Sequence, residues 1–252
     1  DTPCHFAAEP LDRASSRRAD PAWIAARLAD PASVVVPLYK GDPLLRGRET
    51  AFLSTAALGE FPKGAPVVFL GLKGETAYFA ADVSAAPSPE QAPFAEIGRY
   101  TPLREAAAML DDADLAIVGE GRWLLDWHRR HRYCARCGAA TEIAEGGAKR
   151  QCPECSTEHF PRSDPVAAGL AEHEGACLLG RSPRFPPGFV SALAGYVEAA
   201  ETPEACAIRE LKEEAGVTLL DARYQFSQPW PFPSSLMMGF IAAAATRDLA
   251  LD

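Results

Sequence analysis

The sequence predicts a mixed protein of the α+β and α/β classes, built from three parts in chain order. Three observations predict this organisation. Short apolar runs alternate with turn residues in the first hundred residues, two pairs of closely spaced cysteines follow, and one well-delimited helix lies between strand-like runs near the end. We therefore expect a small N-terminal mixed α/β domain at 1–120, a helix with a cysteine-rich ribbon at 121–162, and a C-terminal α/β domain at 163–252.

The composition is that of an ordinary globular protein. The chain has 252 residues, of which 48% are hydrophobic and 23% charged, enough for two or three compact units. No stretch approaches the roughly 18 consecutive apolar residues of a membrane span, and the N-terminus lacks a secretory pattern. We expect a cytoplasmic protein with no membrane partner, although the start at Asp1 rather than Met leaves open a missing initial segment with a targeting signal.

The net charge restricts the mode of ligand binding. A formal charge of -9 argues against a protein that holds nucleic acid through a broad basic surface, because that mode needs many Lys and Arg facing phosphates. Bound divalent cations or single arginines can still supply local positive charge to a phosphate compound. Charge alone does not select the substrate.

The N-terminal part contains strand and helix signals. Apolar runs at 34–36 and 67–70 precede turn residues, which predicts strands of a small sheet. The segment 85–93 holds three prolines and suits a surface connection. Helical spacing follows at 103–110, and a second helix is expected from about Gly121 to His131.

The last ninety residues have the pattern of an α/β unit. Strand-like runs at 166–170, 176–179 and 189–197 precede the helix, and two more follow it, the final one at 236–245. The helix itself is well delimited. Thr202 is a capping residue, Pro203 suits the first helical position, and Gly216 suits a C-terminal stop, so the helix is expected at 203–215.

Four of the seven cysteines form two pairs with metal-ligand spacing. The pairs are separated by fourteen residues, a distance at which two chain reversals can present four thiolates to one zinc ion. The expected ligands are Cys134, Cys137, Cys152 and Cys155. A closed four-thiolate site leaves no position for catalysis, so the zinc is structural. The alternatives are a redox dithiol or an iron–sulfur site; disulfide scaffolding explains the odd number of cysteines poorly.

Basic residues lie beside the cysteine pairs. They are Arg129, Arg130, Arg132 and Arg136. One interpretation is a zinc ribbon that binds RNA without catalysing a reaction. The other, which we favour, is a solvated basic helix end that complements the helix dipole.

The predicted helix at 203–215 carries a cluster of acidic residues. Glu210, Glu213 and Glu214 fall at i, i+3 and i+4, which places three carboxylates on one face. Such a face is either solvated or a binding site for hard divalent cations, whose preferred ligands are oxygens. Taken alone, the spacing favours the solvated face.

The whole string at 195–217 changes this interpretation. It satisfies the pattern Gly-x5-Glu-x7-Arg-Glu-hydrophobic-x-Glu-Glu-x-Gly-hydrophobic at all nine specified positions, and so it resembles the Nudix hydrolases. The resemblance implies an α/β/α sandwich whose loop and helix hold Mg²⁺ or Mn²⁺ against a diphosphate. It implies that Glu210 and Glu214 are metal ligands, that Glu213 is a further ligand or the general base, and that the Ala194 carbonyl is another ligand.

The same resemblance implies a supporting role for two further motif residues. Glu201 and Arg209 are expected to pair and to hold the loop against the helix rather than to touch the metal.

A proline-rich segment at 227–237 presents Trp230 and Phe232. Exposed rings can stack on a planar base, whereas the alternative is a loop packed by its own aromatics, and composition leaves the two about even. The segment is similar to the SQPWPFPxS sequence of NADH pyrophosphatases within the Nudix group. The resemblance implies a dinucleotide site lined by Gln228, Pro229, Trp230, Pro231, Phe232, Pro233, Ser234 and Ser235.

Two residues outside this segment are further candidates. Phe160 occupies a place where relatives usually have a tyrosine that contacts the substrate, so stacking is retained and a hydroxyl contact is lost. Arg104 is a candidate for a phosphate contact from the N-terminal domain.

The resemblance covers nearly the whole chain and implies cleavage of NAD(H) to NMN(H) and AMP, with removal of NAD caps from RNA by some relatives. A Nudix enzyme for ADP-ribose or a diadenosine polyphosphate, and the RNA-binding module, are the alternatives. In relatives a further strand and a C-terminal helix supply another acidic ligand and homodimer contacts. Since the sequence ends at Asp252, we expect it to be truncated.

Overall fold

The computed structural model describes residues 4–250. The expected initial segment before Asp1 and the expected strand and helix after Asp252 lie outside the described residues. The chain divides into two compact units. One comprises 1–162 with 231–233, and the other comprises 163–230 with 234–252. Between residues 4 and 250, none of the helices combines the length and the apolarity needed to cross a membrane.

The first unit contains a sheet in the order β3-β2-β1-β6-β5, with β4 on β1 and β7 on β2. The strands are β1 Val34–Tyr39, β2 Asp42–Arg46, β3 Glu49–Thr50, β4 Leu53–Ser54, β5 Val67–Lys73, β6 Thr76–Asp82 and β7 Arg99–Tyr100. β1 and β6 are parallel and the other pairs are antiparallel. The two predicted strands are confirmed, because they lie in β1 and β5.

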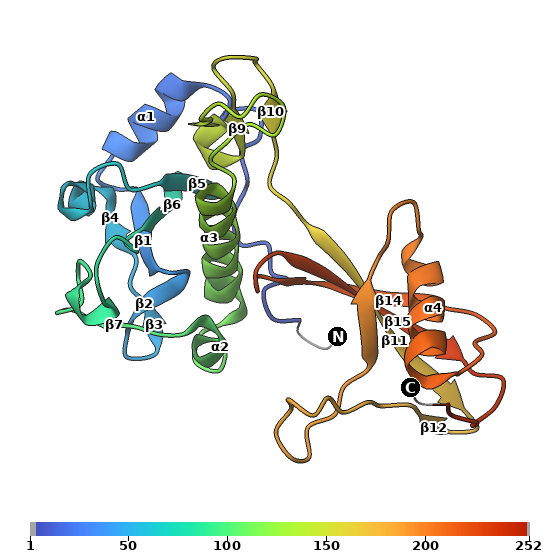
Figure 1. Cartoon of the computed structure of the whole chain (residues 1–252). Helices are drawn as coiled ribbons and strands as arrows, with labels where there is room; N and C mark the ends of the chain where they lie inside the picture. The colour runs from blue at the N-terminus through green and yellow to red at the C-terminus, as the bar shows by residue number, and fades with distance from the viewer. Residues whose placement is uncertain (1–3, 251–252) are drawn as a thin grey trace. The chain divides into compact units, whose positions relative to one another are not determined.

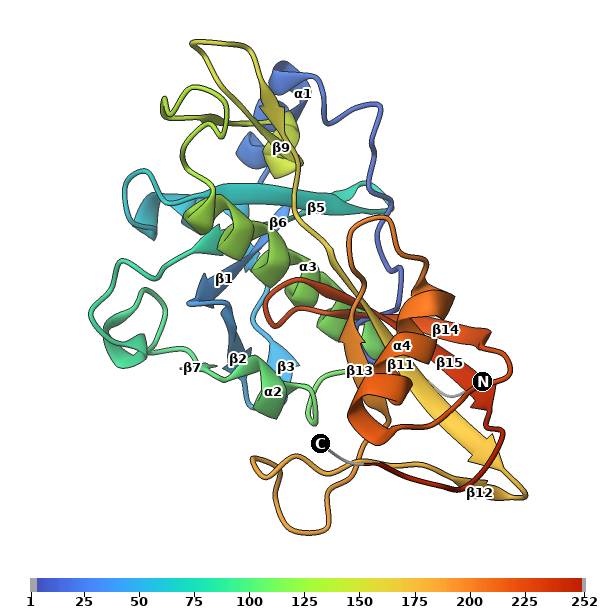
Figure 2. The same cartoon turned by 45° about the vertical axis from the view of Figure 1, so that its right-hand side comes forward.

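The helices of this unit are α1 Pro21–Ala29, α2 Leu103–Ala106 and α3 Asp112–Arg130, with 3-10 turns η1 Thr55–Glu60 and η2 Pro89–Gln91. α3 lies across the sheet and packs against β5 and β6 (Figures 1 and 2). The helical pattern at 103–110 gives only the short α2, followed by turns.

The predicted start of the long helix at Gly121 is wrong, since α3 begins at Asp112. The Asp111 side chain caps it by accepting a hydrogen bond from the Asp114 amide at 2.8 Å. Gly121 is a point of close packing rather than a boundary. A Cβ atom there would lie 2.8 Å from Cβ of Ala80 on β6, so glycine lets the helix approach the sheet.

The cysteine-rich ribbon belongs to the first unit. Its strands β8 Glu142–Ala144, β9 Lys149–Gln151 and β10 Glu158–His159 form an antiparallel sheet, with the turn η3 Glu145–Gly147 between β8 and β9. The turn packs on β5, where a Cβ atom on Gly147 would lie 2.6 Å from Cγ1 of Val68.

A buried polar network joins the ribbon to α3. Arg150 donates from Nη1 to Nδ1 of His128 at 3.2 Å, and Nε2 of His128 therefore donates to the Gly147 carbonyl at 2.8 Å. Arg150 also donates to the hydroxyl and the carbonyl of Thr141. Each of these polar groups is satisfied without water, which suits their burial.

The second unit contains a sheet in the order β12-β11-β15-β14, with β13 on β11. Its elements are β11 Asp164–His173, β12 Ala176–Cys177, β13 Leu193–Tyr196, α4 Pro203–Ala215, β14 Arg223–Trp230 and β15 Ser235–Ala243. β11 and β15 are parallel. The helix α4 packs on β11 and β13, at one face of the sheet (Figure 2). Within residues 163–250, it is the one helix of the expected sandwich.

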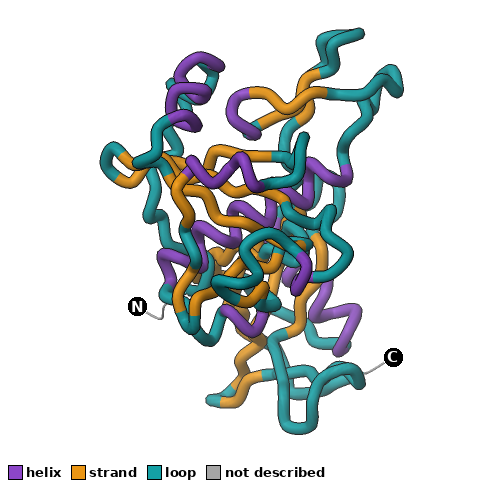
Figure 3. Tube along the Cα trace, turned by 90° about the vertical axis from the view of Figure 1, so that its left-hand side faces the viewer, coloured by secondary structure: helices purple, strands orange, loops and turns teal. Residues whose placement is uncertain are grey.

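Two predicted strands of this unit are shorter than expected. The run at 176–179 contributes only the two residues of β12, and the run at 189–197 contributes β13. The segment between them, 178–192, is mainly a loop, closed by a bridge between Gly180 and Ser191 (Figure 3). The expected class is confirmed: a mixed N-terminal domain, a ribbon and a C-terminal α/β unit.

We predict that protonation of His128 destabilises the first unit. Burial lowers the pKa of His128 from 6.5 to about 4. Between pH 6.5 and about pH 4, the His128 side chain is protonated in the unfolded chain but stays neutral in the folded chain. Stability that is fully present above the unfolded pKa is therefore lost as the pH falls toward the folded pKa. Between about pH 7.5 and about pH 5.5 the expected loss is about 1 kcal/mol.

The measurement is urea denaturation at both pH values, followed by fluorescence of tryptophans that include Trp127, whose ring centroid lies 4.7 Å from that of His128. The variant His128→Gln supplies the control. It should be less stable at neutral pH and should lack this part of the pH dependence. Equal pH dependence in the two proteins would contradict the assignment.

Candidate active site and zinc centre

The four predicted zinc ligands meet at one point. One ligand atom from each of Cys134, Cys137, Cys152 and Cys155 lies within 4.8 Å of all the others. The sulfurs of Cys134 and Cys155 are 3.6 Å apart, and those of Cys137 and Cys152 are 3.5 Å apart. Tetrahedral zinc with Zn–S bonds of about 2.3 Å places its sulfurs about 3.8 Å apart, so the arrangement fits zinc.

Each cysteine pair is shaped by a matching turn. The amide of Cys134 donates to the Ala139 carbonyl at 2.7 Å, and the amide of Gly138 donates to the Cys134 carbonyl at 2.9 Å. The second turn repeats these bonds around Cys152 and Ser156. Gly138 and Ser156 adopt φ values of +79° and +57°. Local backbone geometry therefore produces the ligand spacing.

Polar neighbours support the thiolates. The Thr157 hydroxyl lies 3.2 Å from Sγ of Cys155 and holds the pKa of that thiol down, at about 6. Nε2 of His159 lies 3.4 Å from Sγ of Cys134. Zinc binds the thiolate form, so groups that favour deprotonation favour the metal.

The acidic helix has the bounds that the sequence predicted. The Thr202 hydroxyl accepts a hydrogen bond from the Ala205 amide at 3.2 Å, and Gly216 ends the helix at φ +69°. Leu211 faces β11, where a Cβ atom on Gly169 would lie 2.2 Å from Leu211 Cδ1. The apolar face of α4 therefore packs closely, which leaves its acidic residues on other faces.

Arg209 is the centre of the acidic cluster. Its guanidinium donates to Glu201 at 2.8 and 2.9 Å, to Glu210 at 2.7 Å and to Glu213 at 3.0 Å. It also donates to the Tyr196 carbonyl at 3.1 Å, which ties the end of β13 to α4. The hydrogen bonds from Arg209 lower the pKa of Glu201 to about 2. The Glu201–Arg209 pair thus holds the loop against the helix.

Gly195 of the motif is required by the Glu210 carboxylate. A Cβ atom on Gly195 would lie 1.8 Å from Cδ of Glu210, so any other residue would displace the carboxylate. The carboxylate of Glu210 therefore lies against β13 at Gly195, which directly follows Ala194, the residue whose carbonyl is the expected further ligand. Ala194 pairs with Ala168 of β11 in the sheet register.

Arg209 does not neutralise the charge of the Glu214 carboxylate. It pairs instead with Glu201, Glu210 and Glu213. Among residues 4–250, no cation lies within ion-pair distance of it, and burial together with the charge of Glu210 raises its pKa. The donors fit a hard divalent cation chemically, because such ions prefer carboxylate oxygens and Glu214 has no paired cation among the described residues. Across the described residues, only the four cysteines bring three or more ligand atoms within 4.8 Å, so the acidic residues are less tightly gathered.

The segment at 227–237 forms the central part of a β-hairpin, in agreement with the two strand-like runs predicted after the helix. Its residues up to Trp230 complete β14, and those from Ser235 onward begin β15, with Trp230 opposite Ser235 in the register. Only residues 231–234 form the tip. The buried Ser234 hydroxyl donates to Oδ2 of Asp164 at 3.2 Å, which fixes one end of the tip.

The two isolated candidates lie in the first unit. Phe160 follows β10 directly and is 64% exposed, so its ring is available for stacking. Arg104 of α2 places its guanidinium carbon 4.2 Å from the centroid of Phe232. A residue that sequence reasoning missed is Arg122 of α3, whose Nε donates to the Pro231 carbonyl at 2.8 Å. No motif surrounds it, so nothing in the sequence singles it out.

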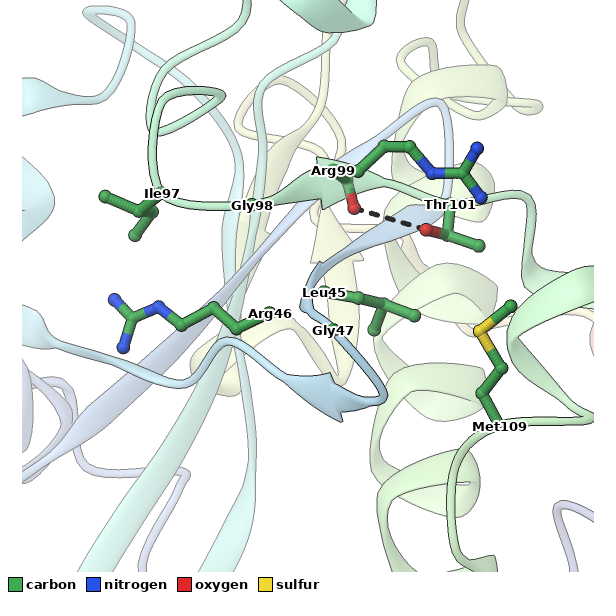
Figure 4. A pocket seen from close by; sticks show the side chains of 8 residues that line it. All are labelled: Leu45, Arg46, Gly47, Ile97, Gly98, Arg99, Thr101 and Met109. Atoms are coloured by element: carbon green, nitrogen blue, oxygen red, sulfur yellow. Dashed lines mark hydrogen bonds between the residues drawn. The ribbon is translucent and has the colours of Figure 1, made fainter.

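Within the described residues, the cavities of the first unit include two that can be compared with the predicted site. One of about 500 Å³ is lined by Leu45, Arg46, Gly47, Ile97, Gly98, Arg99, Thr101 and Met109, and none of the predicted site residues lies in it (Figure 4). The other, of about 240 Å³, is lined by Phe232 and Pro233 together with Arg122 and Lys40. The second cavity therefore adjoins the predicted dinucleotide segment.

We predict opposite effects for substitutions at the two cysteine turns. Gly138→Ala forces an alanine into a left-handed conformation, which costs about 1 kcal/mol and should weaken zinc binding about fivefold. Ser156→Gly relieves the same conformation and should bind zinc at least as tightly. Competition with a chromogenic chelator measures both. Equal affinities for both variants and the unchanged chain would contradict the role of these turns.

Comparison with known proteins identifies the family. Three family models match successive segments: an NADH pyrophosphatase-like rudimentary NUDIX domain at 32–127, an NADH pyrophosphatase zinc ribbon domain at 129–160 and a NUDIX domain at 162–252. A crystal structure of a NUDIX hydrolase from Nitrosomonas europaea is 27% identical, and the match covers 47% of this chain and 70% of that chain with a TM-score of 0.40.

Two curated relatives carry names that describe an activity. The human NAD-capped RNA hydrolase NUDT12 is 32% identical over 98% of this chain and 63% of its own length. The NAD-capped RNA hydrolase NudC of Stutzerimonas stutzeri is 37% identical over 81% of this chain and 68% of its own length. The chain thus spans less than two thirds of the human relative. With its matching zinc ribbon, rudimentary domain and Nudix helix, the chain belongs to the NADH pyrophosphatase family of Nudix hydrolases.

Proposed function

We propose that this protein hydrolyses the pyrophosphate bond of NAD(H) in a divalent-metal-dependent reaction that yields NMN(H) and AMP. The observation that carries the proposal is the acidic cluster on α4, where Arg209 neutralises part of the charge and Glu214 is left uncompensated. The names of the relatives support the same bond cleavage.

The metal would be Mg²⁺ or Mn²⁺, held by Glu210, Glu214 and the Ala194 carbonyl. When bound, such an ion neutralises the diphosphate and lowers the pKa of a coordinated water. Glu213 is 59% exposed and accepts one hydrogen bond from Arg209, so it is available as a further ligand or as the general base. Arg209 orients these carboxylates by holding Glu201 and Glu210 at the same time.

The hairpin residues 228–235 would recognise the dinucleotide. The half-buried Trp230 ends β14 beside the tip. Phe160 of the first unit stays a separate candidate for stacking, with an exposed ring. Arg104 stays a candidate for a phosphate contact, and its guanidinium carbon lies 4.2 Å from the centroid of Phe232.

Free NAD(H) and NAD-capped RNA both contain the bond to be cleaved. The relatives are named for the capped RNA, whereas the net charge of -9 favours the free dinucleotide. We propose that both are hydrolysed at the same site.

We also propose a cytoplasmic homodimer with the domain division 1–120, 121–162 and 163–252. The cytoplasmic assignment rests on cysteine usage, since free thiols and a four-cysteine metal site are typical of a reducing compartment. The dimer rests on the family resemblance.

Glu214→Gln should lower kcat for NADH by about 10²–10³-fold, because it removes a carboxylate from the metal site. Glu204→Gln is the matched control, since Glu204 lies on the first turn of the same helix. Release of AMP in the presence of Mg²⁺ or Mn²⁺ measures the rate, and circular dichroism verifies the fold. Near-normal turnover by Glu214→Gln would show that α4 is not the catalytic element.

A substrate panel separates the proposed function from its alternatives. NADH and NAD-capped RNA should both be cleaved with higher kcat/KM than ADP-ribose or a diadenosine polyphosphate. Faster cleavage of either alternative compound would transfer the assignment to another Nudix activity. Salt-sensitive RNA binding without cleavage would identify a binding module instead.

A further inference from the structure

Residues 231–233 at the tip of the β14–β15 hairpin belong to the first compact unit, although the two strands belong to the second. Four residues of the first unit lie against this tip, and we refer to them as the loop seat. They are Phe6, Arg104, Gly119 and Arg122.

The side chain of Phe232 is in contact with three members of the seat. The guanidinium carbons of Arg104 and Arg122 lie 4.2 and 5.1 Å from its ring centroid. The ring of Phe6 meets it edge-on, with centroids 6.1 Å apart and an angle of 82°. Both distances to arginine are within the range of a cation–π interaction. A ring held in this way is a poor candidate for stacking on a nucleotide base.

The backbone of the tip is held as well. Nε of Arg122 donates to the Pro231 carbonyl at 2.8 Å. Gly119 lies one helical turn earlier on the same face of α3. A Cβ atom on Gly119 would lie 2.9 Å from Cδ1 of Phe6 and 3.5 Å from Cγ of Pro231. Glycine at this position therefore allows the tip to approach the helix.

The side chain of Arg122 is itself held in place by residues at the β1–β2 turn. Its Nη1 donates to Oδ1 of Asp42 at 3.1 Å, and the same oxygen accepts the Leu103 amide at the start of α2. A Cβ atom on Gly41 would lie 2.8 Å from Arg122 Cγ, so the side chain crosses the β1–β2 turn closely. Asp42 thus offsets the charge of Arg122 and joins the two helices that carry the arginines of the seat.

We propose that Arg122 is a positioning residue for dinucleotide binding, which acts through Phe232 as the anchor of the hairpin tip. The inference rests on the proposed function and assigns a role to the first compact unit. This unit holds residues 231–233 in one conformation, so that Trp230, which precedes them in the chain, is ordered before the substrate arrives. Affinity then depends on the fraction of molecules in which the tip is seated.

Kinetics of Arg122→Gln test this role. The variant loses the donor to Pro231 and the charge beside Phe232. The KM for NADH should rise about tenfold, as expected if only about a tenth of the molecules keep the tip seated, while kcat changes by less than about twofold. Arg122→Lys, which retains the charge, should recover part of the affinity. The control is Arg46→Gln, at an exposed arginine in the separate cavity of Figure 4, and its KM should be unchanged.

A double-mutant cycle decides whether Arg122 acts through Phe232. If it does, Arg122→Gln with Phe232→Leu should raise KM no further than the worse of the two single substitutions. Multiplied effects would mean that the residues act independently and would overturn the proposal. A fall in kcat with unchanged KM would overturn it too.

A measurement without substrate separates this proposal from the proposed function. Hydrogen exchange of a peptide covering 223–236 should be faster in Arg122→Gln than in the unchanged chain, and unaffected in Arg46→Gln. This result is expected even if NADH is not hydrolysed, in which case only the proposed function fails. Equal exchange rates in Arg122→Gln and the unchanged chain would show that Arg122 does not hold the hairpin tip, and would overturn the proposal.

Gly119→Ala gives a second test, with a variant that is expected to fold. Alanine favours the helix more than glycine does, so loss of folding is not the expected result. Its Cβ atom would displace Phe6 and crowd Pro231. We expect faster exchange of the hairpin peptide and a raised KM at an unchanged or higher Tm. An unchanged KM together with unchanged exchange would contradict the seat.

Discussion

The candidate active site depends on the charge of Arg209. Three glutamates surround this one guanidinium, and without it their mutual repulsion would push the acidic face of α4 away from the loop before it. The same group donates to the Tyr196 carbonyl, so it also sets where the end of β13 lies. One arginine therefore combines charge neutralisation with the placement of the loop.

Glycines allow other parts of the chain to pack closely around the site and on the sheets. Gly195 leaves room for the carboxylate of Glu210, Gly169 leaves room for Leu211, and Gly121 lets α3 lie on β6. At each position a side chain or a backbone from a distant part of the chain occupies the space that a Cβ atom would take. The site residues are thus held by packing as well as by charge, and the loop seat at Gly119 follows the same principle.

The ribbon obtains its order in a different way. Its strands are two or three residues long, and at 142–160 most side chains are at least partly exposed. A metal bound by four thiolates stabilises such a segment where a hydrophobic core cannot. The buried network of His128, Arg150 and Thr141 then connects the ribbon to α3. Metal and polar network together replace the apolar core that larger domains use.

The sequence by itself determined the features that depend on neighbouring residues. The cap, the stop and the acidic spacing of α4, and the two cysteine turns, arise from hydrogen bonds and helical periodicity within a few residues, so the pattern contains all the information. Tertiary structure alone decided the close packing of α3 on β6, the register of the strands at 223–243 and the contacts of Phe232 with Arg104 and Arg122. These depend on residues brought together across the fold, whose proximity no local pattern encodes.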